Sequence, residues 1–232
     1  MVFGFGYDCV HDDYKVVRMV EFYGKDKSNL WRRIQDFPYY LWYRGRASGV
    51  FASGALHWVV SPKPESDKSR LIAAFDLADK EYRLVPQPDN YSLVNSHMSM
   101  VVLEGCLCLL CNYFSVHVDI WVMKEYGVME SWTKLFSVAQ PTTIDKFKWV
   151  RPLAYSQSHE KVLMQQDNKR LLWYDLEKKT VDFIEIYGVE SVTFADFYYQ
   201  SLVWPRGRDG GKKQPAKDKV KKKKDKKKKK KR

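Results

Sequence analysis

The residues best suited to chemistry in this sequence are three cysteines in one short apolar run. Cys106, Cys108 and Cys111 have the spacing C-x-C-x-x-C, and His97 and His117 lie on either side of them. Thiolate and imidazole are ligands that zinc prefers, which makes the run a candidate metal site. In a strand, however, alternation turns Cys111 to the face opposite Cys106 and Cys108. No second Cys or His pair has the spacing of a zinc finger, so we predict packed, reduced thiols and no metal or cofactor.

Residue types used in nucleophilic catalysis are present, but their spacing matches no catalytic pattern. Ser48 and Ser53 each precede a glycine, yet neither lies in a G-x-S-x-G turn between a strand and a helix. Residues 44–49 lack the spacing of a phosphate-binding loop. His57 precedes a tryptophan in an apolar run, where packing in the core is favoured over a role as a general base. We therefore predict that the chain is not an enzyme.

Residues 54–88 show which elements must position these side chains. Three short apolar runs, rich in β-branched and aromatic residues, are separated by segments of Gly, Pro, Asp and Ser. No run has the i, i+3, i+4 spacing of an amphipathic helix. The pattern predicts a small antiparallel meander of three strands.

The same pattern recurs twice, from residue 105 and from residue 152. Phe75, Ile120 and Tyr174 occupy matching places, at offsets of 45 and 54 residues. These offsets are close to the roughly 50-residue period of kelch-type propeller blades. We predict an all-β fold, a kelch-like or propeller-like array of antiparallel three- to four-stranded sheets, and not a single sandwich.

A weaker unit precedes these three. Residues 13–20 predict a strand, and residues 30–34 match the strand that holds Trp132. Only residues 23–29 separate Phe22 from Leu30, which is a turn and too short for a further strand. We expect this first unit to be shortened, the array to be incomplete at its N-terminus, and material to precede the chain.

Recurring aromatic and acidic residues are predicted to be scaffold. Tryptophans are expected at equivalent strand positions, where their bulk fills the space between sheets: Trp58, Trp121, Trp132 and Trp173. Asp76 and Asp175 each begin a polar turn, in which the carboxylate accepts hydrogen bonds from amides two residues later.

The charge of the chain is concentrated at its C-terminal end. The whole sequence has a net charge of +12, yet residues 206–232 contain 17 Lys or Arg and 3 Asp or Glu, which leaves residues 1–205 at −2. We predict a β domain over residues 1–205 and a disordered tail over 206–232, because Lys-rich sequence has too little apolar surface to fold. The tail is a candidate nuclear-import segment through Lys221, Lys222, Lys223, Lys224, Lys226, Lys227 and Lys228.

The sequence shows no targeting or membrane segment. Residues 1–8 lack the charged and apolar regions of a secretory signal. The longest apolar region, residues 105–118, is shorter than the roughly 18 to 20 residues that span a membrane. We expect a soluble protein of the cytoplasm and nucleus, with its four cysteines reduced.

An ordered set of motifs resembles one plant protein family. The strings FGFGYD (residues 3–8) and DDYKVVR (residues 12–18) are similar to the hallmark of plant F-box proteins with a type 1 F-box-associated interaction domain. This group includes S-locus F-box proteins and related regulators of immune receptors. Further matches, together covering roughly residues 3–203, lie at residues 28–34, 49–58, 72–77, 103–107 and 130–134.

The resemblance implies a propeller-like domain that recognises the target protein of a Skp, cullin and F-box ubiquitin ligase. In that family an N-terminal helical F-box docks on the Skp adaptor. No F-box precedes Phe3, and the family's opening Asn-Gly-Leu and Leu-Trp-Asn-Pro strands are also missing. We therefore expect a substrate-recognition module that binds the adaptor only when an F-box is present upstream.

Two questions about binding stay open at this point. Target-binding loops are expected at residues 35–46, 62–70, 87–96 and 140–148, and the first has the aromatic and arginine composition of binding hot spots: Tyr39, Tyr40, Trp42, Tyr43, Arg44 and Arg46. The alternative for these aromatics is that they fill a sheet interface. The alternative function is nucleic-acid binding through the tail, which deletion of residues 207–232 would abolish.

Overall fold

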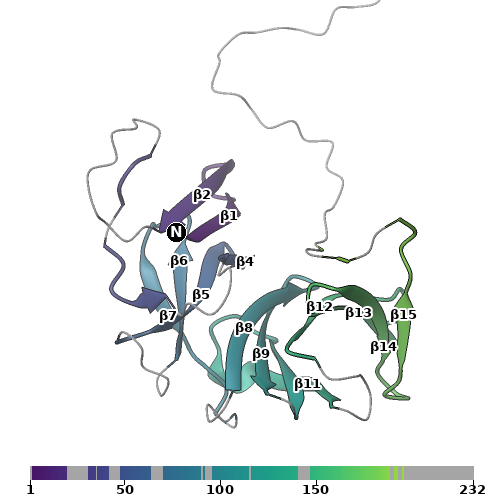
Figure 1. The fold of residues 1–232 in the computed structure, drawn as a ribbon. Coiled ribbons are helices and arrows are strands. Elements are labelled where there is room, and N and C mark those ends of the chain that lie inside the picture. The colour runs from purple at the N-terminus through teal and green to yellow at the C-terminus, as the bar shows by residue number, and fades with distance from the viewer. Residues whose placement is uncertain are drawn as a thin grey trace, which may run out of the picture. The chain divides into compact units, whose positions relative to one another are not determined.

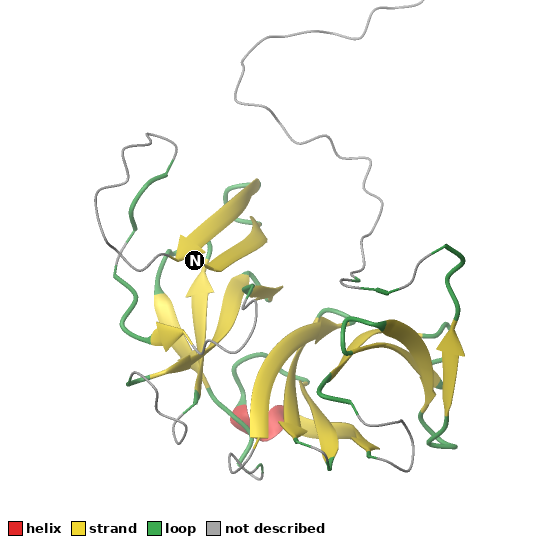
Figure 2. Cartoon of the chain, viewed as in Figure 1, coloured by secondary structure: helices red, strands yellow, loops and turns green. Residues whose placement is uncertain are grey.

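The computed structural model describes residues 2–19, 31–34, 36–41, 48–63, 70–89, 91, 96–114, 116–140, 147–188, 191–192 and 195. In this part of the chain the regular structure is β-strand, apart from one 3-10 helix, Met129–Ser131. The strands form four antiparallel sheets (Figure 1; Figure 2). The predicted array of antiparallel sheets is confirmed.

Each sheet is built from strands that follow one another along the chain, and all are simple meanders except the second. The first sheet pairs β1 (Val2–Asp8) with β2 (Asp13–Met19). In the second sheet β3 (Tyr40–Leu41) and β4 (Val50–Ala52) both pair with β5 (Ala55–Ser61), followed by β6 (Leu71–Asp76) and β7 (Tyr82–Val85). The third sheet is β8 (Ser96–Leu103), β9 (Cys106–Tyr113), β10 (His117–Met123) and β11 (Trp132–Ala139). The fourth is β12 (Val150–Tyr155), β13 (Lys161–Gln166), β14 (Arg170–Asp175) and β15 (Val181–Ile184).

The three predicted meanders are therefore present, and the second and third sheets each have strands ahead of the predicted ones. The first unit differs from expectation. Residues 31–34, predicted as part of a strand, are described without strand structure. A strand is defined by its ladder of hydrogen bonds, and no ladder partner for these residues lies within the described segments. The predicted shortening concerns residues 22–30, which lie outside the described residues.

The third sheet explains why one strand is apolar almost throughout. Alternate residues of β9 enter two different cores: Leu107, Leu109 and Cys111 pack in a cluster with residues of the second sheet, whereas Cys108 and Leu110 pack with residues of the fourth. A strand buried on both faces has no solvent side on which to place polar residues. Stacking of sheets face to face thus accounts for the continuous run that the cysteines occupy.

A third cluster joins the first two sheets. Val2, Val17 and Met19 of the first sheet pack with Leu56 and Trp58 of the second. The first and second sheets also share one parallel bridge between Gly4 and Gly49, in which the Gly49 amide donates to the Phe3 carbonyl at 2.7 Å. The second and third sheets are therefore covered on both faces, and the first sheet has one covered face.

Aspartates close three of the hairpin turns, as predicted for two of them. The amides of Ala78 and Asp79 donate to Oδ1 of Asp76 at 2.9 and 3.2 Å. The amides of Glu177 and Lys178 do the same for Asp175, at 3.1 and 2.8 Å. Asp8 accepts equivalent bonds in the turn after β1. These bonds fix the turns because a carboxylate replaces the missing backbone acceptor.

The expectation that four tryptophans occupy equivalent positions is wrong. Trp58 lies in β5, the middle of its sheet, and Trp132 lies at the start of β11, an edge strand. Trp121 and Trp173 are both in third strands, but Trp121 is buried and Trp173 is half-buried. The inter-sheet cores are filled by different residues in each pair of sheets, so a shared residue type does not mark a shared position.

Candidate protein-interaction surface

The cysteines are positioned by β9 for packing. Cys106 and Cys108 face one side of the strand and Cys111 the other, which confirms the predicted alternation. Burial raises the pKa of the Cys108 and Cys111 thiols to about 12, so both stay protonated at neutral pH. Among the residues that the structure describes, no group of three or more His, Cys, Asp or Glu is placed to hold a metal ion.

His57 is a core histidine, as predicted. Its Nδ1 lies 3.1 Å from the Val50 carbonyl oxygen, and its Nε2 lies 2.7 Å from the hydroxyl of Tyr126. Because a carbonyl only accepts, Nδ1 carries the proton, and Nε2 accepts from the hydroxyl. Burial, and secondarily the charge of Arg83, lower the pKa of His57 to about 4. The neutral ring therefore ties the second sheet to the connection between β10 and β11.

The predicted target-binding loop lies only partly within the described residues. Tyr39 is half-buried beside Phe37, with ring centroids 5.6 Å apart, and both pack against the cluster between the first and second sheets. Tyr40, in β3, is 51% exposed. Tyr39 thus helps to fill the interface between two sheets, which was the alternative to target binding, and Tyr40 does not. Trp42, Tyr43, Arg44 and Arg46 lie outside the described residues, as do the lysines predicted for nuclear import.

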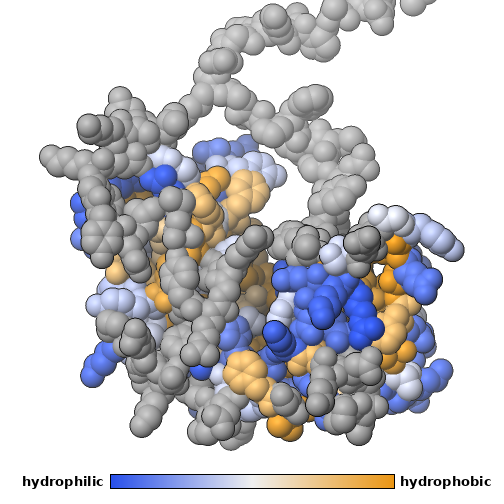
Figure 3. Space-filling model, in the orientation of Figure 1, coloured by the Kyte–Doolittle hydropathy of each residue, from blue (hydrophilic) through white to orange (hydrophobic). Residues whose placement is uncertain are grey.

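The first sheet presents a surface that sequence reasoning did not single out. Phe3 (44% exposed), Phe5 (58%), Tyr14 (48%) and Val16 (50%) all lie on its outward face. The strand register places Phe5 opposite Val16 and Tyr7 opposite Tyr14. Figure 3 shows hydrophobic side chains at the surface over β1 and β2. We call Phe3, Phe5, Tyr7, Tyr14 and Val16 the aromatic face.

Three rings of the aromatic face, those of Phe5, Tyr7 and Tyr14, are in contact. The centroids of Phe5 and Tyr14 are 5.5 Å apart, with an interplanar angle of 4°. Tyr7 lies 5.2 Å from Tyr14 in a tilted arrangement. Stacked and tilted pairs of this kind are favourable for aromatic rings. These three rings therefore form one continuous patch and are not scattered exposed residues.

Glycines force these aromatics outward. Gly4 and Gly6 alternate with Phe3, Phe5 and Tyr7 along β1 and face the second sheet. A Cβ at Gly4 would lie 2.8 Å from a methyl of Leu56, and one at Gly6 would lie 2.3 Å from the ring of Phe51. Both distances are shorter than side chains tolerate, so the inner face of β1 holds glycine. The apolar bulk of this strand consequently lies on the solvent side.

An ion cluster around the buried carboxylate of Asp8 anchors the hairpin beneath this face. The Asp8 carboxylate bonds to the Lys15 ammonium, and it lies 2.7 Å from Nδ1 of His11. Lys15 also donates to the Leu77 carbonyl at 2.9 Å, which fastens the hairpin to the second sheet. Burial alone would raise the pKa of Asp8, but the bonds from Lys15 and His11 outweigh it and hold the pKa well below its usual range.

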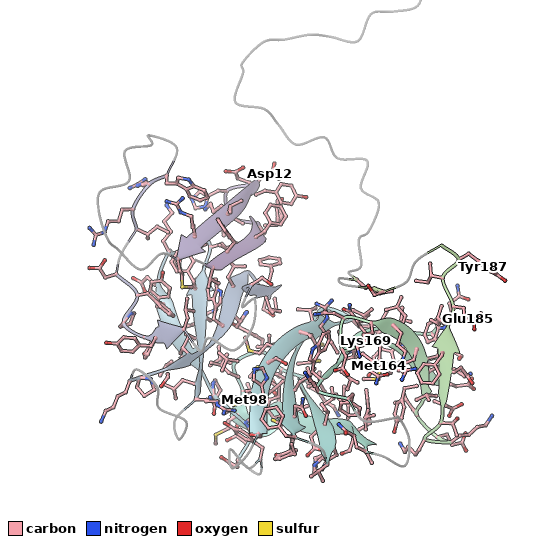
Figure 4. All side chains as sticks on the ribbon, in the orientation of Figure 1. Asp12, Met98, Met164, Lys169, Glu185 and Tyr187 are labelled. Atoms are coloured by element: carbon pink, nitrogen blue, oxygen red, sulfur yellow. The ribbon has the colours of Figure 1, made fainter. Side chains whose placement is uncertain are left out.

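The two ends of the aromatic face carry opposite charge. At the hairpin tip, labelled by Asp12 in Figure 4, the Tyr7 hydroxyl donates to the Asp12 carboxylate at 2.6 Å. At the other end Arg18 lies opposite Phe3 and stacks 4.7 Å above the ring of Trp31. The face therefore has an acidic end, an apolar middle and a basic end.

These observations define the class of fold: antiparallel β-sheets stacked face to face, with an exposed aromatic face on the first sheet. The family model described as "F-box associated beta propeller domain" matches residues 1–206. The chain belongs to this family, as the motifs at residues 3–8 and 12–18 predicted.

Curated relatives agree with the family. The chain is 40% identical over 230 residues to F-box protein CPR1 of Arabidopsis thaliana, a match that covers 87% of this chain and 55% of that protein. It is 32% identical over 243 residues to F-box protein At4g22390 of Arabidopsis thaliana, covering 93% and 60% of the two chains. F-box/kelch-repeat protein At3g23880 of the same plant is 31% identical over 160 residues, covering 65% and 43%. The chain spans about half the length of these relatives.

No helix in the described segments has the length and hydropathy needed to cross a bilayer.

Proposed function

We propose that this chain is a non-catalytic substrate-recognition module of Skp, cullin and F-box ubiquitin ligases, and that its aromatic face contacts the target protein. Family membership supports the general role. The observation that carries the contact surface is the set of outward side chains on β1 and β2, which Gly4 and Gly6 leave no room to turn inward.

The composition of the face suits protein binding. Aromatic residues and arginine dominate binding hot spots, and the aromatic side chains bury large areas with few rotatable bonds. The ring contacts and the ion cluster at Asp8 hold the hairpin in place before a partner arrives. A preorganised surface loses little conformational entropy on binding.

Adaptor binding is expected to require an added F-box. The described residues contain no α-helix, whereas the F-box of the resembled family is helical. Tagged chain incubated with recombinant Skp adaptor should not retain it, and the same chain fused behind a complete F-box should. The F-box fused to an unrelated β protein is the control for folding of the fusion. Retention of the adaptor by the unfused chain would contradict the proposed division of labour.

Target recognition is expected to depend on the aromatic face. In plant cells that express the F-box fusion, target proteins should fall in abundance and recover when the proteasome is inhibited. The double variant Phe5→Ser, Tyr14→Ser should lose this effect, since each lost hot-spot ring costs about 1 to 2 kcal/mol of binding energy. Tyr40→Ser, an exposed aromatic outside the face, is the matched control. If Tyr40→Ser abolishes turnover and the double variant does not, the target contacts the predicted loop instead.

A further inference from the structure

The aromatic face is complementary to itself. Three rows of paired residues cross it: Phe3 with Arg18, Phe5 with Val16, and Tyr7 with Tyr14. The middle row is apolar, the first row carries the cation, and the third lies beside the Asp12 carboxylate. The outer rows are four residues apart along β1, about 13 Å at the rise of a strand. The charges therefore lie on opposite sides of an apolar centre.

We propose that two copies of this chain associate through their aromatic faces, related by a twofold axis through the Phe5–Val16 row. Rotation about this axis places the first row of one copy over the third row of its partner. Arg18 of each copy then meets Asp12 of the other, and Phe5 meets the partner's middle row. In such an isologous interface every contact occurs twice.

Alternative orientations are less favourable. A parallel arrangement of the two faces would bring Arg18 against Arg18 and Asp12 against Asp12. Like charges brought together at an interface oppose association, and this repulsion selects the antiparallel arrangement. The apolar middle fits either orientation, so the charged ends decide which one forms.

The small area of the face indicates weak association. Aromatic side chains bury about 150 to 250 Å² each, so the half-exposed Phe3, Phe5, Tyr14 and Val16 supply roughly 400 Å² per copy. A stable interface takes about 800 Å² from each partner. We therefore expect a reversible dimer, with a Kd on the order of tens of micromolar, and not an obligate one.

This inference does not depend on the proposed function, although both use the same face. A dimer would cover the residues proposed to contact the target. Target binding and self-association would then exclude each other, and each can fail while the other holds.

Sedimentation velocity of the full chain across a range from about 1 to 200 µM tests the proposal. The mean mass should rise from one copy towards two. Phe5→Ser should weaken association at least tenfold, while Tyr40→Ser, which removes an equally exposed ring elsewhere, should leave it unchanged. Circular dichroism confirms that each variant is folded.

A second set of variants, which changes the charges at the ends of the face, tests the dimer even if Phe5→Ser disturbs the hairpin. Asp12→Arg or Arg18→Asp alone should weaken association, because each places like charges together. The double variant should restore association, because the two charges have exchanged places and still attract each other. A chain that stays monomeric at 200 µM, association that survives Phe5→Ser, or a double variant no better than the single ones would overturn the proposal. A chain that stays monomeric but still binds a target through this face would overturn the dimer and leave the proposed function intact.

Discussion

Replacing Trp132 by alanine is expected to lower the free energy of unfolding by about 3 to 5 kcal/mol. Trp132 is 8% exposed and packs in the cluster between the second and third sheets. Its indole Nε1 also donates to the Pro86 carbonyl at 2.9 Å, at the end of β7. Alanine removes the ring from that core and leaves the carbonyl without its donor. Total stabilities are roughly 5 to 15 kcal/mol, so the loss is a large share.

Urea unfolding followed by circular dichroism measures this effect. Trp132→Phe keeps part of the ring but not the donor and should cost roughly 1 to 2 kcal/mol. Trp173→Ala removes the same residue type from a half-buried position in β14 and should cost less than Trp132→Ala. Equal losses at Trp132 and Trp173 would indicate equivalent positions after all. A soluble Trp132→Ala protein of unchanged stability would refute the stacked-sheet core.

Acidification from pH 7 to pH 4 is expected to remove about 3 kcal/mol of stability through His57 alone. Burial lowers the pKa of this ring from its ordinary 6.5 to about 4. Between these two values the unfolded chain binds a proton that the folded chain does not. Stability is therefore complete above pH 6.5 and declines as the pH falls towards 4.

The loss has a local structural cause. Protonation places a positive charge on a buried ring, and the Tyr126 hydroxyl, which donates to the neutral Nε2, has to turn and accept from it instead. It also places a second cation near Arg83, whose guanidinium lies 5.6 Å from the centroid of the Tyr126 ring. Both effects act at the contact between the second sheet and the connection from β10 to β11.

Comparison of stability at several pH values isolates this residue. His57→Gln keeps a polar side chain that does not titrate. The loss in free energy of unfolding between pH 6.5 and pH 4 should therefore be smaller in this variant by about 3 kcal/mol. Groups common to both proteins, Asp8 among them, cancel in the difference. Tyr126→Phe leaves the histidine buried and should keep the slope. An identical slope in wild type and His57→Gln would rule out the buried neutral histidine.

Much of the fold could be predicted because its signals are local. Apolar runs of strand length, separated by turns with Asp and Gly, are enough to identify the last three sheets. The side of the strand on which each cysteine lies followed from alternation alone. The tryptophans were mispredicted because their roles depend on which sheet lies opposite, and a sequence repeat does not contain that information.

The aromatic face was missed for a related physical reason. Alternation was used to find strands with an apolar inner side and a polar outer side, but β1 alternates glycine with aromatics. Without the structure, Phe3 and Phe5 look like core residues. Only the distances from Gly4 to Leu56 and from Gly6 to Phe51 show that the inner side has no space for a side chain. The FGFGYD string was informative about family, and its surface role became visible only in three dimensions.

The alternation along β1 also has an evolutionary consequence. Positions that pack against the second sheet and positions proposed to contact a partner follow each other one by one along a single strand. Exchange of Gly4 or Gly6 for a larger residue would collide with the neighbouring sheet, whereas exchange of Phe3 or Phe5 changes the exposed face and, at Phe5, the stacking on Tyr14. Selection can therefore change the proposed contact surface at a smaller cost in stability than it can change the glycines between these positions.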